Sequence, residues 1–243
     1  MITSKSNDII KNIIKLKTKK YSKERGLCVV ESIKLIYELY EKGLLETILV
    51  IDKKYELVKH FKNVKIEIIS EEIAKFISDA VTTDGVIAIC KIPQNKGISY
   101  NKSLILDRIQ DPSNMGAIIR SARAFGFTTI FTLDSTYPYT FKCIRSSMGH
   151  VFGVSIIDVT LDELKKIKID NNIQFITADM DGCAIEKYLK TNENFAIIIG
   201  NEGSGVSEDL RKLSDKIVSI PMDKDVESLN ASVSAGIIMY YLK

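Results

Sequence analysis

The stretch FAIIIGNEGSGVSEDL, at residues 195–210, decides how the second half of this chain folds. Its first five residues, Phe195–Ile199, are all apolar, which predicts a strand buried on both faces. Three glycines follow at Gly200, Gly203 and Gly205, and residues 206–213 have the spacing of a short helix. A strand that passes through glycines into a helix exposes backbone N–H groups and lets a ligand come close. One such loop can equally be a tight turn, so the rest of the chain must decide.

The composition is that of an ordinary globular protein. The 243 residues are 45% apolar and 27% charged, enough for one large domain or two modest ones. We expect no signal peptide and no membrane partner, because no apolar run approaches the roughly 20 residues that span a bilayer. The four cysteines are scattered without a C-x-x-C pair, and there are two histidines. This pattern predicts no metal site and a cytoplasmic location.

Positive charge is concentrated near the start of the chain. Residues 1–100 carry 18 Lys and Arg against 13 Asp and Glu, whereas residues 101–243 carry 16 against 18. Within residues 11–25, seven basic side chains have one acidic neighbour, Glu24. A cluster of this kind suits a polyphosphate partner, and a solvated helix face explains it equally well. The candidates for RNA binding in it are Lys17, Lys19, Lys20 and Arg25.

The first hundred residues alternate between strand and helix patterns. Strands are predicted at residues 27–30, 47–51, 65–69 and 86–90, and helices at 8–16, 31–39, 55–61 and 70–77. The segment between the first helix and the first strand is predicted to be a basic loop. Residues 93–97, PQNKG, then break the periodicity. We therefore expect a small α/β domain at residues 1–92, a linker at 93–102 and a second domain at 103–243.

The alternation restarts in the second domain. Strands are predicted at residues 104–109, 129–133, 154–159, 173–177, 195–199 and 216–220. Helices are predicted at residues 114–125, 141–148, 161–168, 184–189, 206–213 and 228–242. This order predicts a mainly parallel sheet with helices on both faces.

Three segments of this domain carry more polar residues than packing requires: 106–126, 200–205 and 219–242. Each begins near the carboxyl end of a strand and opens a helix, which predicts a ligand crevice in an open α/β sheet. Ser113 or Asn114 is the expected cap of the first helix and Ser228 that of the last. Arg120 lies on an otherwise apolar helix, where a guanidinium needs an anion or a carboxylate. Arg123 is expected to be a charged residue on the protein surface.

Several known sites do not fit these segments. The sequence GNEGSGV is neither G-x-x-x-x-G-K-[ST] nor G-x-G-x-x-G, which argues against a nucleotide P-loop and against an NAD-binding Rossmann fold. Neither His60 nor His150 falls in the three segments, so a Ser-His-Asp site is not expected.

The three segments together resemble a known family. N-x-G-A-I-I-R at 114–120, G-N-E-G-S-G at 200–205 and I-P-M…E-S-L-N-A-S-V at 220–233 resemble the three motifs of the SpoU (TrmH-like) RNA 2′-O-ribose methyltransferases. The resemblance covers about residues 103–243. The first domain, through its basic segment and V-V-E-S-I-K at 29–34, is similar to the ribosomal-protein-like RNA-binding domain that often precedes it.

The resemblance implies an α/β trefoil-knot fold of the SPOUT type, S-adenosyl-L-methionine as cofactor and a homodimer through the catalytic domains. The residues that match the family's catalytic set are Asn114, Arg120, Glu202, Ser228 and Asn230. Those expected to hold the cofactor are Thr177, Ala178, Gly200, Asn201, Gly203, Ile220, Met222, Ser228 and Leu229. Arg123 and Arg145 join the four basic residues above as RNA-binding candidates.

The implied activity is transfer of a methyl group to a ribose 2′-hydroxyl of RNA. The two-domain layout favours large-subunit ribosomal RNA over tRNA as the substrate. We expect Arg120 to stabilise the developing alkoxide, because a guanidinium keeps its proton at neutral pH and is therefore a poor base. The alternatives are a tRNA ribose methyltransferase and a non-catalytic RNA-binding protein of ribosome assembly with the same fold.

Overall fold

The computed structural model describes residues 1–80, 82–94, 97–187, 194–223 and 225–243, which form two compact units. The first unit comprises Met1–Pro93 and Tyr139–Gly149, and the second comprises Gln94–Pro138 and His150–Lys243. The sequence placed the helix at 141–148 in the second domain, whereas its contacts group it with the first unit. The expected domain limits, including the linker at 93–102, stay a prediction.

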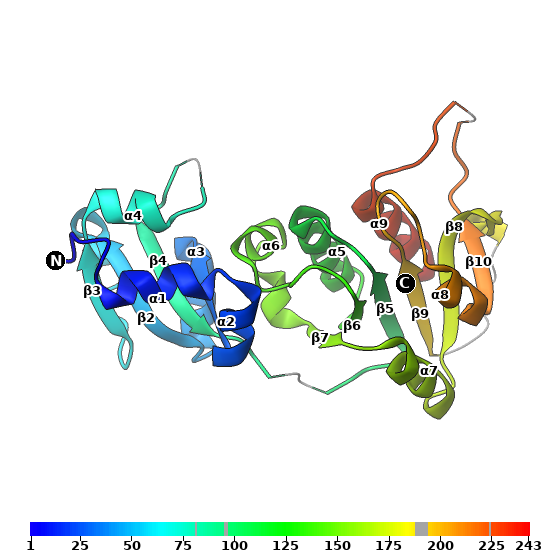
Figure 1. Cartoon of the computed structure of the whole chain (residues 1–243), viewed down its shortest axis with the longest axis horizontal. Helices are drawn as coiled ribbons and strands as arrows, with labels where there is room; N and C mark the ends of the chain where they lie inside the picture. The colour runs from blue at the N-terminus through cyan, green and yellow to red at the C-terminus, as the bar shows by residue number, and fades with distance from the viewer. Residues whose placement is uncertain (81, 95–96, 188–193, 224) are drawn as a thin grey trace. The chain divides into compact units, whose positions relative to one another are not determined.

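The first unit is a four-stranded sheet with helices on its faces (Figure 1). The sheet order is β1-β4-β2-β3, with β2 and β3 parallel and the other pairs antiparallel. The elements are α1 (Asp8–Leu16), α2 (Lys19–Arg25), β1 (Leu27–Glu31), α3 (Ile33–Glu41), β2 (Leu45–Ile51), η1 (Asp52–Leu57), β3 (Lys65–Ile69), α4 (Glu71–Ile77), β4 (Val86–Lys91) and α6 (Phe141–Ser146).

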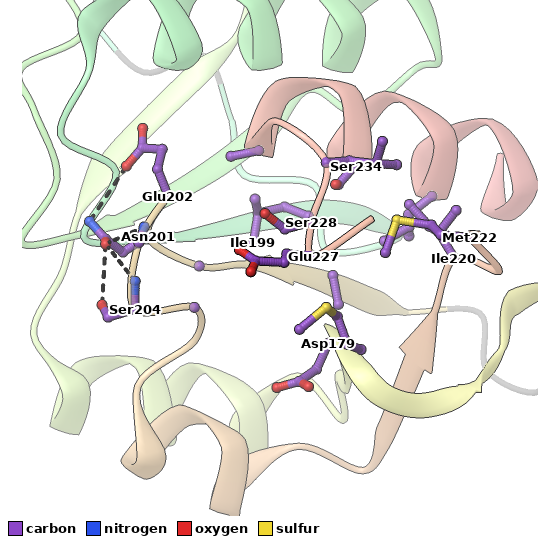
Figure 2. A pocket seen from close by; sticks show the side chains of 18 of the residues that line it. Asp179, Ile199, Asn201, Glu202, Ser204, Ile220, Met222, Glu227, Ser228 and Ser234 are labelled. Carbon is purple, nitrogen blue, oxygen red and sulfur yellow. Dashed lines mark hydrogen bonds between the residues drawn. The ribbon is translucent and has the colours of Figure 1, made fainter. Parts of the chain in front are cut away.

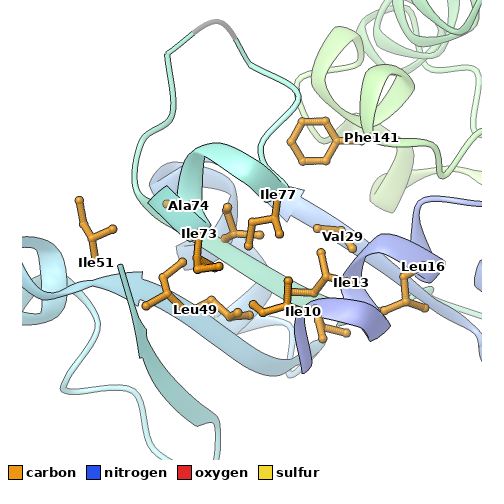
Figure 3. Packing of buried hydrophobic residues seen from close by; sticks show 13 residues of the cluster. Ile10, Ile13, Leu16, Val29, Leu49, Ile51, Ile73, Ala74, Ile77 and Phe141 are labelled. Atoms are coloured by element: carbon orange, nitrogen blue, oxygen red, sulfur yellow. The ribbon is translucent and has the colours of Figure 1, made fainter. Parts of the chain in front are cut away.

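Helices α1 and α4 cover one face of this sheet (Figure 3). Ile10, Ile13 and Leu16 recur along α1 at the three- to four-residue spacing of one helical face, and all three are buried. Figure 3 shows Ile73 and Ile77 of α4 in the same cluster. Burial of such side chains contributes about 1.5–3 kcal/mol each, so this face carries much of the unit's stability.

The second unit is built on a six-stranded sheet in which every described pair of strands is parallel. The sheet order is β10-β8-β9-β5-β6-β7. The elements are β5 (Lys102–Asp107), α5 (Pro112–Ala124), β6 (Thr129–Leu133), η2 (His150–Gly153), β7 (Ser155–Asp158), α7 (Leu161–Asp170), β8 (Gln174–Ala184), η3 (Ile185–Lys187), β9 (Phe195–Ile199), α8 (Glu208–Leu213), β10 (Lys216–Ser219) and α9 (Ala231–Leu242).

Helices lie on both faces of the second sheet, as the sequence predicted. Leu164 of α7 and Leu210 of α8 are buried in one cluster with Ile105 and Ile198 of the central strands. Helices α5 and α9 lie side by side, and α9 contacts β8 and β9 (Figure 1). All five residues of β9 are buried, which explains its uninterrupted apolar sequence.

The last part of the chain returns from the edge of this sheet toward its middle. β10 pairs with β8 at the edge, and α9 then packs against α5 and β9. Residues 220–223 and 225–230 belong to the connection between these two places. The family resemblance implies a trefoil knot in this last part of the chain, and the knot stays a prediction. No helix in the described part of the chain is long and apolar enough to cross a membrane.

Three predicted elements differ from the structure. The basic segment expected as a loop contains α2, which ends at Gly26 with a left-handed φ of 64°. The helix expected at 55–61 is the 3₁₀ helix η1, displaced toward the N-terminus. The helix expected at 184–189 is replaced by the end of β8 and by η3, and its last two residues lie outside the described residues.

Two helix caps also differ. The Asp111 side chain caps α5 by accepting a hydrogen bond from the Ser113 N–H at 3.0 Å, so the expectation of Ser113 or Asn114 was wrong. The reason is Pro112, whose fixed φ suits the first helical position, so that the residue directly before it, Asp111, becomes the cap. Asn230, rather than Ser228, caps α9 by accepting from the Ser232 N–H at 2.9 Å.

Candidate active site

The glycine loop, residues 200–207 between β9 and α8, closes tightly on itself. A Cβ atom at Gly200 would lie 2.2 Å from the Gly205 carbonyl carbon, so only glycine fits there. Asn201 and Gly205 exchange two backbone hydrogen bonds of 3.0 Å each. The Asn201 Oδ1 atom also accepts from the N–H groups of Gly203 and Ser204, at 2.9 and 3.0 Å (Figure 2). Asn201 therefore shapes the loop with its own side chain.

Asp107 at the end of β5 and the following residue, Arg108, hold the glycine loop in place. The carboxylate of Asp107, which is fully buried, accepts from the Ser207 N–H at 2.6 Å and from the Arg108 guanidinium at 3.3 Å. Arg108 also donates to the Gly205 carbonyl at 3.1 Å, and its own carbonyl accepts from Asn201 Nδ2 at 2.8 Å. The left-handed backbone of Arg108, with φ at 54°, turns both groups toward the loop.

A chain of directed hydrogen bonds links three separate segments beside this loop. Ser232 donates from its backbone N–H to Asn230 Oδ1, and Asn230 Nδ2 donates to Asn114 Oδ1 at 3.0 Å. Asn114 Nδ2 then donates to a carboxylate oxygen of Glu202 at 2.9 Å. Each donor in this series of hydrogen bonds points toward Glu202. The side-chain amides of Asn230 and Asn114 can therefore each have one orientation only. The starts of α9 and α5 are thereby fixed to the glycine loop.

The pKa of Glu202 follows from these contacts. Burial raises the pKa of this carboxyl, but hydrogen bonds from Asn114 and from the backbone N–H groups of Glu202, Gln110 and Asp111 outweigh it. The pKa of Glu202 therefore lies below its ordinary value. Glu202 is a carboxylate at neutral pH, which can anchor an amide or a cation.

A pocket of about 480 Å³ opens between the glycine loop, residues 178–180 in the middle of β8, and residues 220–222 and 227–229 (Figure 2). Its volume lies in the range of about 300–1,000 Å³ that is typical of small-molecule sites. The lining residues are Ala178, Asp179, Met180, Ile199, Gly200, Asn201, Glu202, Gly203, Ser204, Gly205, Val218, Ile220, Met222, Glu227, Ser228, Leu229, Ala231, Ser234 and Ile238. The pocket thus has apolar walls and a polar rim that includes Glu202.

Comparison with known proteins identifies this arrangement. The SpoU rRNA Methylase family matches residues 101–240. The chain belongs to the SpoU rRNA methylase family. The MRM3-like substrate binding domain matches residues 7–88, so the SpoU domain of this chain follows a second recognised domain.

Two curated relatives of this SpoU methylase are named for 23S rRNA. The chain is 29% identical to "23S rRNA (guanosine(2553)-2'-O)-methyltransferase RlmP" of Bacillus subtilis, over 100% of the chain and 98% of that protein. It is also 29% identical to "23S rRNA (adenosine(1067)-2'-O)-methyltransferase" of Streptomyces laurentii, over 74% of the chain and 69% of that protein.

A solved structure shares the fold over nearly the whole chain. The AdoMet-bound rRNA methyltransferase from Sinorhizobium meliloti matches with a TM-score of 0.88 at 23% identity, over 99% of this chain and 95% of that one. The likeness agrees with the predicted α/β fold in which a smaller domain precedes the methyltransferase domain.

The SpoU motifs come together at the pocket. All predicted cofactor residues line it except Thr177, which is fully buried, with its hydroxyl hydrogen-bonded to that of Ser214. Of the predicted catalytic residues, Glu202 and Ser228 line the pocket, and Asn114 and Asn230 join it through the hydrogen-bond chain. Arg120 is exposed on α5, and in the described part of the chain no hydrogen bond or ion pair holds its guanidinium.

The predicted RNA-binding residues are distributed over both units. Lys19, Lys20 and Arg25 are exposed on α2, and the Arg25 guanidinium lies over the Tyr21 ring at 5.3 Å. Lys17 is less available, because it pairs with Asp79 at 2.7 Å and its side chain is 17% exposed. Arg123 of the second unit and Arg145 of the first unit are both exposed.

Four charged residues at this site were not predicted from the sequence: Asp107, Arg108, Asp179 and Glu227. Asp107 carried a signal, because it is a lone carboxylate at the end of an apolar strand, within the polar segment 106–126. Glu227 directly precedes Ser228 in the third motif, so it too could have been selected. Asp179 carried no comparable signal, since only the fold brings the middle of β8 to the pocket. Among the described residues, no group of three or more His, Cys, Asp and Glu is placed to hold a metal ion.

Proposed function

We propose that this chain transfers a methyl group from S-adenosylmethionine to the 2′-hydroxyl of a guanosine ribose in 23S ribosomal RNA. The observation that carries the proposal is the hydrogen-bond chain Asn230–Asn114–Glu202, which joins all three family motifs at the rim of one pocket. The Bacillus subtilis relative, whose name specifies a 23S guanosine and a 2′-O-methyl product, matches over the whole chain and supports this choice of substrate.

The residues of the pocket fit such a cofactor. Gly200 has no side chain and lines the pocket with backbone atoms alone, so a ligand can approach its main chain closely. Ile220, Leu229 and Ile238 give an apolar surface suited to a flat heterocycle. Bound S-adenosylmethionine would supply a methyl group on a sulfonium. The remaining roles belong to the protein's own side chains.

The side chains at the rim would position and activate the hydroxyl. The bound cofactor would supply the methyl group to the 2′-oxygen, and the hydroxyl proton would leave to phosphate or water. Glu202 holds Asn114, and Ser228 offers a hydroxyl at the same rim. Arg120 is the group that we assign to the developing alkoxide and the neighbouring phosphate, because a planar guanidinium donates several hydrogen bonds and keeps its charge.

The first unit would hold the RNA. Its exposed Lys19, Lys20 and Arg25 on α2 suit phosphates, whose neutralisation supplies most of the sequence-independent affinity for nucleic acids. We further propose a cytoplasmic enzyme that forms a homodimer through its SpoU domains.

Methyl transfer to isolated RNA tests the proposal. The full chain is incubated with methyl-labelled S-adenosylmethionine and 23S rRNA from cells that lack the gene, and nuclease fragments are analysed by mass spectrometry. We expect one 2′-O-methylguanosine in a defined fragment. Label on a base, or none in rRNA, would overturn the assignment, and label in tRNA supplied in parallel would favour the tRNA alternative. Titration with unlabelled cofactor reports separately whether the pocket binds it.

A further inference from the structure

The described wall of the pocket contains three carboxylates and no basic side chain. Asp179, Glu202 and Glu227 line it, and none of the described lining residues is Lys, Arg or His. A pocket with low-polarity walls and carboxylates of one sign focuses a negative field on whatever it binds. The three carboxylates are not equivalent, however, because their partners differ.

Two of the three carboxylates already have partners within the protein. Asp179 pairs with a guanidinium nitrogen of Arg211, whose other nitrogen lies 3.2 Å from Asp181. The Asp179 charge is therefore compensated from outside the pocket. Glu202 accepts from Asn114 at 2.9 Å and belongs to the hydrogen-bond chain described above.

Glu227 is the carboxylate that remains. In the described part of the chain it has no hydrogen bond and no ion pair, although it lines the pocket beside Ser228 and Leu229. Figure 2 shows its carboxylate over the middle of the pocket, away from Glu202 on the glycine loop. A charged group placed in this way is free to face the ligand.

We propose that Glu227 makes the pocket select the cationic methyl donor over its neutral product. The inference rests on the proposed function and names a specificity residue for that reaction. S-adenosylmethionine carries one net positive charge at neutral pH, because its sulfonium adds to a balanced ammonium and carboxylate. Loss of the methyl group converts the sulfonium into a thioether, so S-adenosylhomocysteine has no net charge. Glu227 attracts the donor and loses that attraction when the product forms, which favours exchange of product for donor.

The strength of the attraction between Glu227 and the donor depends on how far the carboxylate is exposed to solvent. Glu227 is a solvent-exposed residue, so water and salt screen its charge. We expect a preference of about three- to tenfold in dissociation constant, below the value for a buried pair.

Calorimetric titration of the full chain tests the inference with three ligands. These are S-adenosylmethionine, S-adenosylhomocysteine and sinefungin, in which an ammonium replaces the sulfonium centre. Glu227→Gln should weaken the two cationic ligands about three- to tenfold and leave the product within about twofold. The difference should shrink at high salt, because exposed charges are screened.

Asp225→Asn is the matched control, since it removes the same charge from the same loop at an exposed residue that does not line the pocket. Equal weakening of donor and product by Glu227→Gln, no change in either, or an equal effect of Asp225→Asn would overturn the role of Glu227. If the wild-type chain binds the donor and methylates RNA, none of these three results affects the proposed function. Failure of the wild type to bind the donor would overturn the proposed function as well.

Discussion

Arg120 is exposed on α5, and in the described part of the chain no hydrogen bond or ion pair holds its guanidinium, so it is available to an RNA phosphate. If it meets charge that develops mainly in the transition state, its loss lowers turnover far more than binding. Arg120→Ala should therefore reduce single-turnover methyl transfer about a hundred- to a thousand-fold. Cofactor affinity and the melting temperature should stay close to those of the wild type.

Two further variants separate this chemistry from a general charge effect. Arg120→Lys should not restore activity, since an ammonium cannot reproduce the planar fork. Arg123→Ala removes a charge of the same kind, three residues further along α5, and should cost far less. Activity of Arg120→Ala within a few-fold of the wild type would disprove the catalytic assignment.

Glu202 gives a prediction that depends on pH. Its folded pKa lies below the ordinary value of 4.5, so the ionised form favours the folded state. This stabilisation is complete above the unfolded pKa and is lost as the pH falls through the folded pKa. Glu202→Gln should therefore lower the melting temperature near neutral pH, and the difference from the wild type should vanish in acid. Glu186→Gln, at an exposed carboxylate of η3, is the control. A difference that persists unchanged at low pH would refute the electrostatic explanation.

At the scale of single elements, the sequence predicted the strands better than the ends of helices. β9 and its glycines could be read directly, because five consecutive apolar residues and a forced close approach at Gly200 are local properties. The caps of α5 and α9 could not, since Ser113, Asn114 and Ser228 are all acceptable cap residues and only the backbone path decides among them.

The basic helix α2 gives a prediction about RNA. Lys19, Lys20 and Lys23 surround one shallow hollow, which they share with a single acidic residue, Glu24. Changing the three lysines together to Ala should weaken RNA binding and flatten the dependence of affinity on salt. The slope should fall by about 0.7–0.9 for each phosphate that is no longer neutralised. Filter binding of 23S rRNA fragments over a series of salt concentrations measures the slope.

Lysines of the same unit outside this helix provide the comparison. Lys42→Ala and Lys62→Ala remove exposed charges from elsewhere and should leave the slope nearly unchanged. An unaltered slope in the triple variant of α2 would mean that the cluster is a solvated helix face.

At the scale of the whole molecule, the site itself could not be derived from local patterns. The bonds from Asn114 to Glu202 and from Asn230 to Asn114 join residues 88 and 116 positions apart. Nothing in the periodicity of either segment specifies these partners. The family resemblance supplied the residues, and the fold shows why they occur together: α5 and α9 are neighbours, and the glycine loop lies at their starts. Arg108 and Asp107 were missed because their role is to hold a loop that lies about a hundred residues further along the chain.

The assembly of the SpoU domain gives the last prediction. Helix α9 exposes Val233, Tyr240 and Tyr241, at 49%, 56% and 51% of their surfaces, and these positions share one face of the helix. Apolar side chains grouped in this way mark an interaction surface. A second copy of the same chain can cover the face with twofold symmetry, which places the α9 residues of each copy in one self-complementary contact. Such a contact needs about 1,200–2,000 Å² of buried surface to be stable, so the adjacent part of α5 must contribute.

We therefore expect a dimer by sedimentation equilibrium at micromolar concentration. Tyr241→Glu places a charge in the proposed interface and should shift the equilibrium toward monomer by about tenfold or more, since an unpaired charge is costly to bury. Ile169→Glu is the control, because Ile169 on α7 is 78% exposed and lies outside that face. A wild-type chain that is monomeric would contradict the prediction. Equal effects of Tyr241→Glu and Ile169→Glu would also contradict it, because dissociation would then result from added surface charge in general.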